Sequence, residues 1–212
     1  MATHRLFRFL SRERRQRIFH PVGIAFVCEV RLEDGAFGAV GTHAGLIRFS
    51  RALGVPAPLP DVLGVALRIA HAHGSGAHQD ILLASSLAGF VPAPTRTFFG
   101  PAFSSLLPYR VDRRLALLVA RAAVPGAVCG SDALAGLERA ADETGVRFRF
   151  SVIPGSRPVG EIVVLERLTP GEAARLRLNP YNTGPRAIPV GLPNRLRDPA
   201  YRGSQAGRPM PR

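Results

Sequence analysis

The chain has 212 residues and a formal net charge of +13, from 28 basic and 15 acidic side chains. This length is typical of one domain, or of one domain with a tail. Apolar residues make up 46% of the chain and charged residues 20%, a balance that allows a packed core and argues against global disorder. No uncharged apolar stretch approaches the ~20 residues of a membrane-spanning helix.

Every basic residue is Arg, because the sequence contains no Lys. This bias is typical of a bacterial genome rich in G and C, and it weakens the usual inference from basic charge to nucleic acid. Residues 1–20 and residues 183–212 each carry +5, whereas the 162 residues between them carry only +3. The two basic ends are either solvated or bind phosphate, acidic lipid or the carboxylates of a cofactor.

The N-terminal region and the cysteines indicate the compartment. Arg8, Arg12 and Glu13 interrupt the start of the chain, which therefore lacks the apolar core of a secretory signal. Two cysteines, Cys28 and Cys129, are too few for a disulfide framework or a zinc site, and both are expected to be buried thiols. We therefore expect a bacterial cytoplasmic protein.

Short apolar runs separated by Gly/Pro turns follow an arginine-rich helix or arm at 4–19. Seven runs have the β-branched content or the alternation of strands. They are 24–32, 46–53, 63–70, 80–86, 115–124, 146–153 and 159–168. The run 115–124 also fits a helix, whereas 146–153 alternates cleanly between apolar and polar residues.

Two helices are expected in the second half of the chain. Residues 131–144 begin with Ser and Asp, and residues 169–178 begin with Thr169-Pro170-Gly171-Glu172, which supplies an N-cap, a Pro at N1 and a Glu at N3. Beyond them, a Pro- and Gly-rich loop precedes a short basic helix. Because successive strands are joined by short turns, the pattern favours an antiparallel barrel over βαβ units. The predicted class is α+β, mainly an antiparallel β-barrel with a few helices.

The polar residues match few catalytic signatures. His71 and His73 lie in a Gly-rich turn, where a surface pair is favoured over a metal site, and the sequence has no HExxH or GxSxG motif. Considered separately, His20 is typical of a histidine at a strand edge and Tyr201 of a packing or surface tyrosine. Their surroundings give both residues a second interpretation.

The stretch from Arg17 to Arg208 resembles the heme-containing catalase superfamily in its small, catalase-related form. The resemblance rests on the order of several segments rather than on any one of them. They are Arg17-x-x-His20, Ile47-Arg48-Phe49-Ser50, Asp61-Val62-Leu63-Gly64-Val65-Ala66-Leu67-Arg68, Asp80-Ile81-Leu82-Leu83, Leu178-Asn179-Pro180-Tyr181-Asn182, Arg197-x-x-x-Tyr201 and Arg208.

This resemblance implies a single catalase-like heme domain over 1–212, with a basic arm at 1–19, a barrel at 20–168, and a proximal segment and basic tail at 169–212. Heme b is the implied cofactor, with its iron held by Tyr201. The implied cofactor-binding residues are Arg17, Arg48, Arg197, Tyr201 and Arg208, and the implied catalytic residues are His20, Ser50 and Ser85. The chain is shorter than a full catalase and keeps only the barrel and a proximal helix.

These residue types suit heme chemistry. A phenolate is a hard anionic donor that stabilises ferric iron, and a nearby cation such as Arg197 favours its ionised form. A neutral His20 can move a proton on a bound peroxide, with Ser50 fixing its tautomer. Asp198 and Pro199 would start the proximal helix and leave Arg197 just outside it. Where catalases place a distal Asn, this chain has Ala84-Ser85-Ser86.

The leading expectation is therefore a heme peroxidase or catalase-like oxidoreductase that acts on hydrogen peroxide or organic hydroperoxides. The alternatives are a heme-dependent isomerase or dehydratase of secondary metabolism, and a non-catalytic heme-binding protein. A nucleic-acid-binding protein is not expected, since the sequence has no aromatic-rich stacking surface or helix-turn-helix signal. We expect a homo-oligomer with no membrane span and at most weak membrane association.

Overall fold

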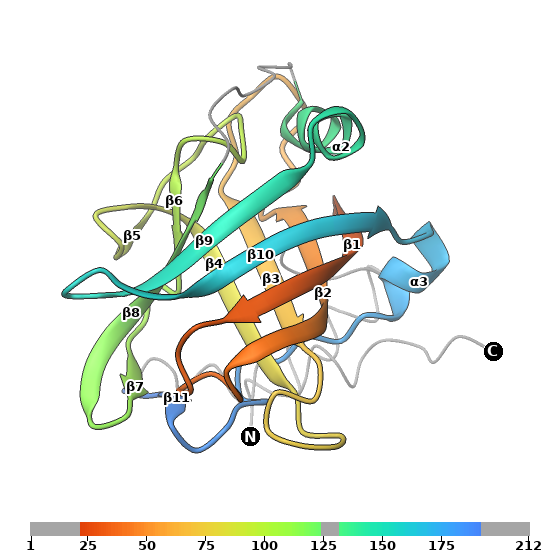
Figure 1. The fold of residues 1–212 in the computed structure, drawn as a ribbon. Coiled ribbons are helices and arrows are strands. Elements are labelled where there is room, and N and C mark those ends of the chain that lie inside the picture. The colour runs from red at the N-terminus through yellow and green to blue at the C-terminus, as the bar shows by residue number, and fades with distance from the viewer. Residues whose placement is uncertain (1–21, 124–131, 192–212) are drawn as a thin grey trace, which may run out of the picture.

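The computed structural model describes residues 22–123 and 132–191. The helix or arm expected at 4–19 and the expected C-terminal basic helix lie outside these residues. In the described part, the dominant feature is a sheet of antiparallel strands that curls and closes on itself (Figure 1). The predicted antiparallel β-barrel is confirmed.

Eight strands form the closed barrel within the described ranges. They are β1 (Val22–Leu32), β2 (Gly41–Arg51), β3 (Leu63–Ile69), β4 (Gln79–Leu87), β6 (Ala102–Ser104), β8 (Arg114–Ala122), β9 (Val146–Ile153) and β10 (Arg157–Arg167). Around the barrel their order is β8-β6-β4-β3-β2-β1-β10-β9, and the pairing of β9 with β8 closes the ring. Each strand of the ring thus has a partner on both sides, although β4 pairs with β6 only over Ala84–Ser86.

Three short strands extend the sheet outside the ring. β5 (Val91–Pro92) pairs with β4, β7 (Tyr109–Val111) pairs with β8, and β11 (Ala187–Pro189) pairs with β7. Helix α2 (Ala133–Glu143) lies at one end of the barrel, and helix α3 (Pro170–Arg175) follows β10 (Figure 1). Neither helix has the length and apolar character that a membrane-spanning helix needs.

The barrel is filled by aromatic side chains that face inward from different strands. The ring of Phe49 in β2 lies 6.0 Å from that of Phe26 in β1 and 5.6 Å from that of Phe148 in β9. Phe98 lies 5.1 Å from Phe49 and stacks on Phe103 of β6. Because side chains alternate along a strand, each inward phenylalanine forces its neighbours in sequence to face outward.

All seven predicted strands correspond to long strands of the barrel, and the run predicted at 115–124 forms strand β8, which ends at Ala122, rather than a helix. Both predicted helices also form: Asp132 caps α2 by accepting a hydrogen bond from the Leu134 amide, and Thr169 and Glu172 form a reciprocal capping box at α3. Helix α3 is shorter than predicted and ends at Arg175. The sequence analysis missed β5, β6, β7 and β11, which have only two or three residues each.

Candidate functional site

Three of the eight predicted site residues lie in the described part of the chain: Arg48, Ser50 and Ser85. The other five, Arg17, His20, Arg197, Tyr201 and Arg208, lie outside it, so their roles stay predictions. The site can therefore be built from the strands that carry the first three residues.

Arg48 and Ser50 lie on the outer face of β2. Ile47 and Phe49 point into the aromatic core, so alternation places Arg48 and Ser50 on the opposite side of the strand. Both outward residues are nevertheless buried, and Arg48 is only 6% exposed. A charged side chain is rarely buried unless the fold requires it, which makes this face of the barrel the leading candidate for a site.

Small residues surround Arg48 and Ser50 on the neighbouring strands. In register with Ser50 lie Gly23 of β1, Gly64 of β3 and, beyond Gly64, Ala84 of β4. In register with Arg48 lie Ala25 and Ala66, followed by Leu82. We call this set of eight outward-facing residues the outer patch. Apart from Leu82, it combines small side chains with one buried cation.

Gly23 is required by the guanidinium of Arg48. A Cβ atom at position 23 would lie 2.7 Å from Nη2 and 2.9 Å from Cζ of Arg48, and 2.4 Å from the carbonyl oxygen of Phe49. Real side chains do not approach so closely, so the guanidinium lies directly over the glycine. The resemblance to catalases gave Arg48 a role but did not identify Gly23 as its platform.

Ser50 places its hydroxyl on the outer patch. Its Oγ donates to the carbonyl oxygen of Gly64 over 3.4 Å. The predicted task of orienting a histidine stays a prediction, because His20 lies outside the described residues.

Ser85 lies on the other side of the sheet from Arg48 and Ser50. It is opposite Phe103, whose ring belongs to the core, and its hydroxyl donates to the Ala93 carbonyl at 2.7 Å while accepting from the Leu63 amide at 3.0 Å. The fully buried hydroxyl thus ties β4 to the start of β3. At this level of β4 the outward-facing residue is Ala84. The structure does not bring Ser85 to the outer patch.

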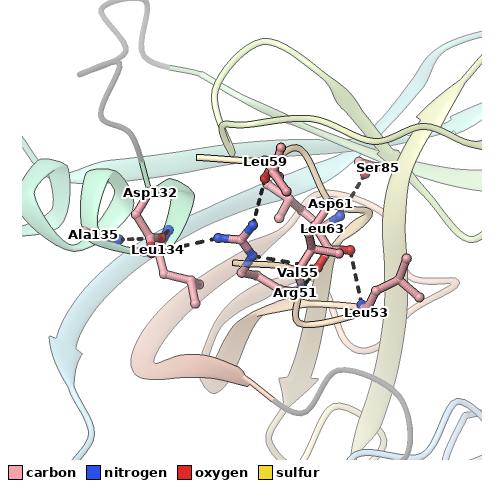
Figure 2. A network of polar contacts seen from close by, with 10 residues as sticks. All are labelled: Arg51, Leu53, Val55, Leu59, Asp61, Leu63, Ser85, Asp132, Leu134 and Ala135. Atoms are coloured by element: carbon pink, nitrogen blue, oxygen red, sulfur yellow. Dashed lines mark hydrogen bonds and ion pairs between the residues drawn. The ribbon is translucent and has the colours of Figure 1, made fainter. Parts of the chain in front are cut away.

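A polar network fixes the end of β2 just beyond Ser50 (Figure 2). The Arg51 Nη2 donates to the Leu59 carbonyl at 2.8 Å, and the guanidinium lies 3.7 Å from Asp61 and 3.8 Å from Asp132. Asp61 also accepts hydrogen bonds from the amides of Leu53 and Val55. Since Asp132 caps α2, this network joins β2, the β2–β3 loop and the helix, and it holds Ser50 in register.

A second network docks the segment 177–184 onto the barrel. Arg68 of β3 makes two hydrogen bonds, of 2.7 and 2.6 Å, to the fully buried carboxylate of Asp80 in β4. The hydrogen bond to Asp80 raises the pKa of Arg68. Arg68 also donates to the Arg177 carbonyl, and Asp80 accepts from the Asn179 amide. The pair thus anchors the segment that contains Asn179 and Arg177.

Gln79, beside Asp80, extends this docking. Its Oε1 accepts from the Thr183 hydroxyl and the Gly184 amide, both at 3.1 Å, and lies 3.1 Å from Nε2 of His73. A Cβ at Gly184 would lie within 2.6 Å of three atoms of the His73 ring, so only glycine fits there. Of these residues the sequence drew attention only to His73, and nothing in it predicted that His73 meets Gln79 and Gly184.

The remaining histidines and Cys28 are occupied by structural contacts. Nδ1 of His71 accepts a hydrogen bond from the Gly76 amide, and Nδ1 of His78 accepts one from the His71 amide. Residues 22–123 and 132–191 contain no group of three metal-ligating side chains. Cys28 is buried as predicted, and desolvation raises the pKa of its thiol to about 12. Cys129 lies outside the described residues.

No protein-family model and no curated protein matches this chain. The site is therefore described by its geometry alone: an outer patch of small residues around a buried arginine, with two polar networks that fix its strands and the segment 177–184.

We expect the Asp80→Asn substitution to lower the free energy of unfolding by about 3 kcal/mol, because it leaves a partly buried Arg68 without its carboxylate. Urea denaturation measures this change. The matched control is Asp112→Asn, which breaks the exposed pair of Asp112 with Arg186 and should cost less than about 1 kcal/mol. Equal effects of the two substitutions would contradict a special role for the Arg68–Asp80 pair.

Proposed function

We propose that this protein is a heme-dependent enzyme of the catalase type that acts on hydrogen peroxide or organic hydroperoxides. The observation that carries the proposal is the outer patch, where Arg48 is buried on an otherwise small-residue face of the barrel. The order of the segments that resemble catalases is a second and independent support.

The outer patch has the two properties that a heme needs from a binding surface. A planar macrocycle requires a face with few projecting side chains, and Gly64, Ala66 and Ala84 project little from the strands beside Arg48 and Ser50. A propionate requires a cation that can pair with a carboxylate through two N–H groups, and Arg48 provides one. The residues of the patch therefore fit the group.

The other heme contacts in this proposal are inferred from the sequence alone. Tyr201 would hold the iron, Arg197 would favour the phenolate form of Tyr201, and Arg17 and Arg208 would join Arg48 at the propionates. The chemistry that heme supplies when bound is the reductive cleavage of a peroxide O–O bond. Two of the alternative functions, isomerisation or dehydration and non-catalytic binding, use the same contacts.

His20 would act as the general acid–base residue. It precedes Val22, the first residue of β1, by two positions, and Val22 is in register with Arg51, the neighbour of Ser50. In this proposal the His20 imidazole would take the proton from one peroxide oxygen and return it to the other oxygen, which departs when the O–O bond breaks. The Ser50 hydroxyl, which also donates to the Gly64 carbonyl, would orient the imidazole.

The side chains of β4 favour organic substrates over dismutation of hydrogen peroxide. Catalase turnover requires a second peroxide to be oriented, and the family uses an amide for this purpose. Here the outward residue is Ala84, Ser85 faces the core side, and the Ser86 hydroxyl donates to the Ala102 carbonyl. A missing hydrogen bond of this kind is worth roughly 1–3 kcal/mol. Oxidation of an organic donor should therefore dominate over oxygen evolution.

Heme titration followed by Soret absorbance tests the outer patch. We expect the double substitution Ala66→Leu/Ala84→Leu to raise the heme Kd at least about fivefold, because large side chains would project into the binding plane at a cost of roughly 1–3 kcal/mol. Ala135→Leu on the exposed side of α2 is the matched control and should bind heme as the wild type does. The absence of a Soret band in the wild type, or equal affinities of all three proteins, would contradict the proposal.

The Tyr201→Phe substitution tests the axial ligand. Loss of the phenolate should abolish the tyrosinate-type absorption spectrum of the ferric protein, whereas Tyr181→Phe, which removes a hydroxyl from the docked segment, should leave it unchanged. An unaltered spectrum in Tyr201→Phe would show that another residue holds the iron. Turnover assays on the loaded wild type, with hydrogen peroxide and with an organic hydroperoxide, then distinguish the enzyme from a non-catalytic heme carrier.

A further inference from the structure

Two hairpins on the same side of the barrel present exposed apolar side chains next to arginines. The β4–β5 hairpin carries Leu87, Phe90 and Val91, and β8 begins with Arg114 and Leu115 directly after the turn from β7. Together with Arg110 and Arg113, we call these residues the hairpin surface. Figure 1 shows β5, β7 and β8 along the same side of the molecule.

Contacts within the fold bring the two hairpins together. The Ser104 Oγ donates to the Gly89 carbonyl at 2.6 Å, and a Cβ at Gly89 would lie 3.3 Å from Cδ1 of Leu117 and 3.2 Å from Cδ1 of Ile153. The β4–β5 turn therefore covers the outer face of β8. Leu115 lies two residues from Leu117 on this same face, and its register partner is Arg110 of β7.

The apolar side chains of the hairpin surface are unusually exposed. Leu87, Phe90, Val91 and Leu115 are between 57% and 69% exposed. Single exposed apolar residues are normal on soluble proteins, whereas a group of large ones at neighbouring loop tips marks an interaction site. The group includes a phenylalanine at a turn, where no neighbouring element of the described fold shields it.

The charge of the hairpin surface selects an anionic partner. Arg110, Arg113 and Arg114 are all exposed, and none of them forms an ion pair with a described residue. The nearest acid in sequence, Asp112, is already paired with Arg186. A symmetric contact between two copies of this surface would bring arginines against arginines, so the charge opposes self-association.

We propose that the hairpin surface binds the face of an anionic lipid bilayer. Protruding turns with one aromatic and several aliphatic side chains can enter the boundary between headgroups and acyl chains, while arginines beside them pair with lipid phosphates. A flat or grooved surface would suit a folded protein partner better, because such partners need a continuous complementary area. This binding does not depend on the proposed heme chemistry, since the surface lies outside the outer patch.

Vesicle flotation with the full-length protein tests the proposal. The probes are vesicles of phosphatidylcholine alone and of phosphatidylcholine mixed with phosphatidylglycerol. We expect binding to the anionic vesicles that weakens with salt. The Arg113→Gln/Arg114→Gln variant should bind them about 30-fold less, because each arginine near such a surface contributes about a factor of five. The affinity of the Phe90→Ser/Leu115→Ser variant for the same vesicles should fall at least about tenfold.

Two control variants separate this surface from the overall positive charge of the chain. Arg31→Gln/Arg139→Gln removes the same charge from exposed positions on β1 and α2, and Leu165→Ser removes an apolar side chain that is 50% exposed on β10. Both should bind nearly as the wild type does. The proposal is overturned if the wild type does not bind anionic vesicles. It is also overturned if the control variants lose as much affinity for these vesicles as the hairpin variants do. It is equally overturned if light scattering shows that Phe90→Ser/Leu115→Ser dissociates an oligomer and leaves lipid binding intact.

Discussion

The alternation of side chains along β2 is the constraint on which the rest of the candidate site depends. Ile47 and Phe49 must enter the aromatic core, since Phe49 contacts rings from β1 and β9 and from the β5–β6 region. Because side chains alternate along a strand, Arg48 and Ser50 face outward. A shift of one residue in register would bury a guanidinium among phenylalanines at a cost of several kcal/mol, a large share of the stability of a typical domain. The same packing that closes the barrel therefore fixes the polar pair on its outer face.

A buried cation on the outside of a barrel is costly unless the surrounding structure is built for it. The strands around Arg48 are held by two networks, Arg51 with Asp61 and Asp132, and Arg68 with Asp80. The first network holds the end of β2, and the second holds the end of β3 and the start of β4. The outer patch lies between them, and a face held in this way would bind a rigid planar ligand with little loss of conformational entropy. This preorganisation is the physical link between the fold and the proposed function.

Much of the fold could be predicted from the sequence, because the long strands carry their own pattern. The run Val146–Ile153 alternates so clearly that its predicted and observed bounds coincide, and Asp132 and Thr169 mark the starts of both helices. The short strands could not be predicted, since β5 and β11 exist only through pairing with distant residues. The resemblance to catalases identified Arg48 and Ser50, which share a face. It could not show that Ser85 faces the other way, or that Gly23 and Gly184 are fixed by the side chains of Arg48 and His73.

The most direct test of the central claim is an NMR comparison of the protein with and without ferric heme, whose paramagnetic iron broadens the signals of nearby nuclei. If the outer patch binds heme, the amide signals of Gly23 and Gly64 broaden on addition of one equivalent. The amides of Arg121 and Arg149, on the opposite side of the ring of strands, remain sharp. Broadening centred on β8 and β9, or no broadening at Gly23 and Gly64, would contradict the account.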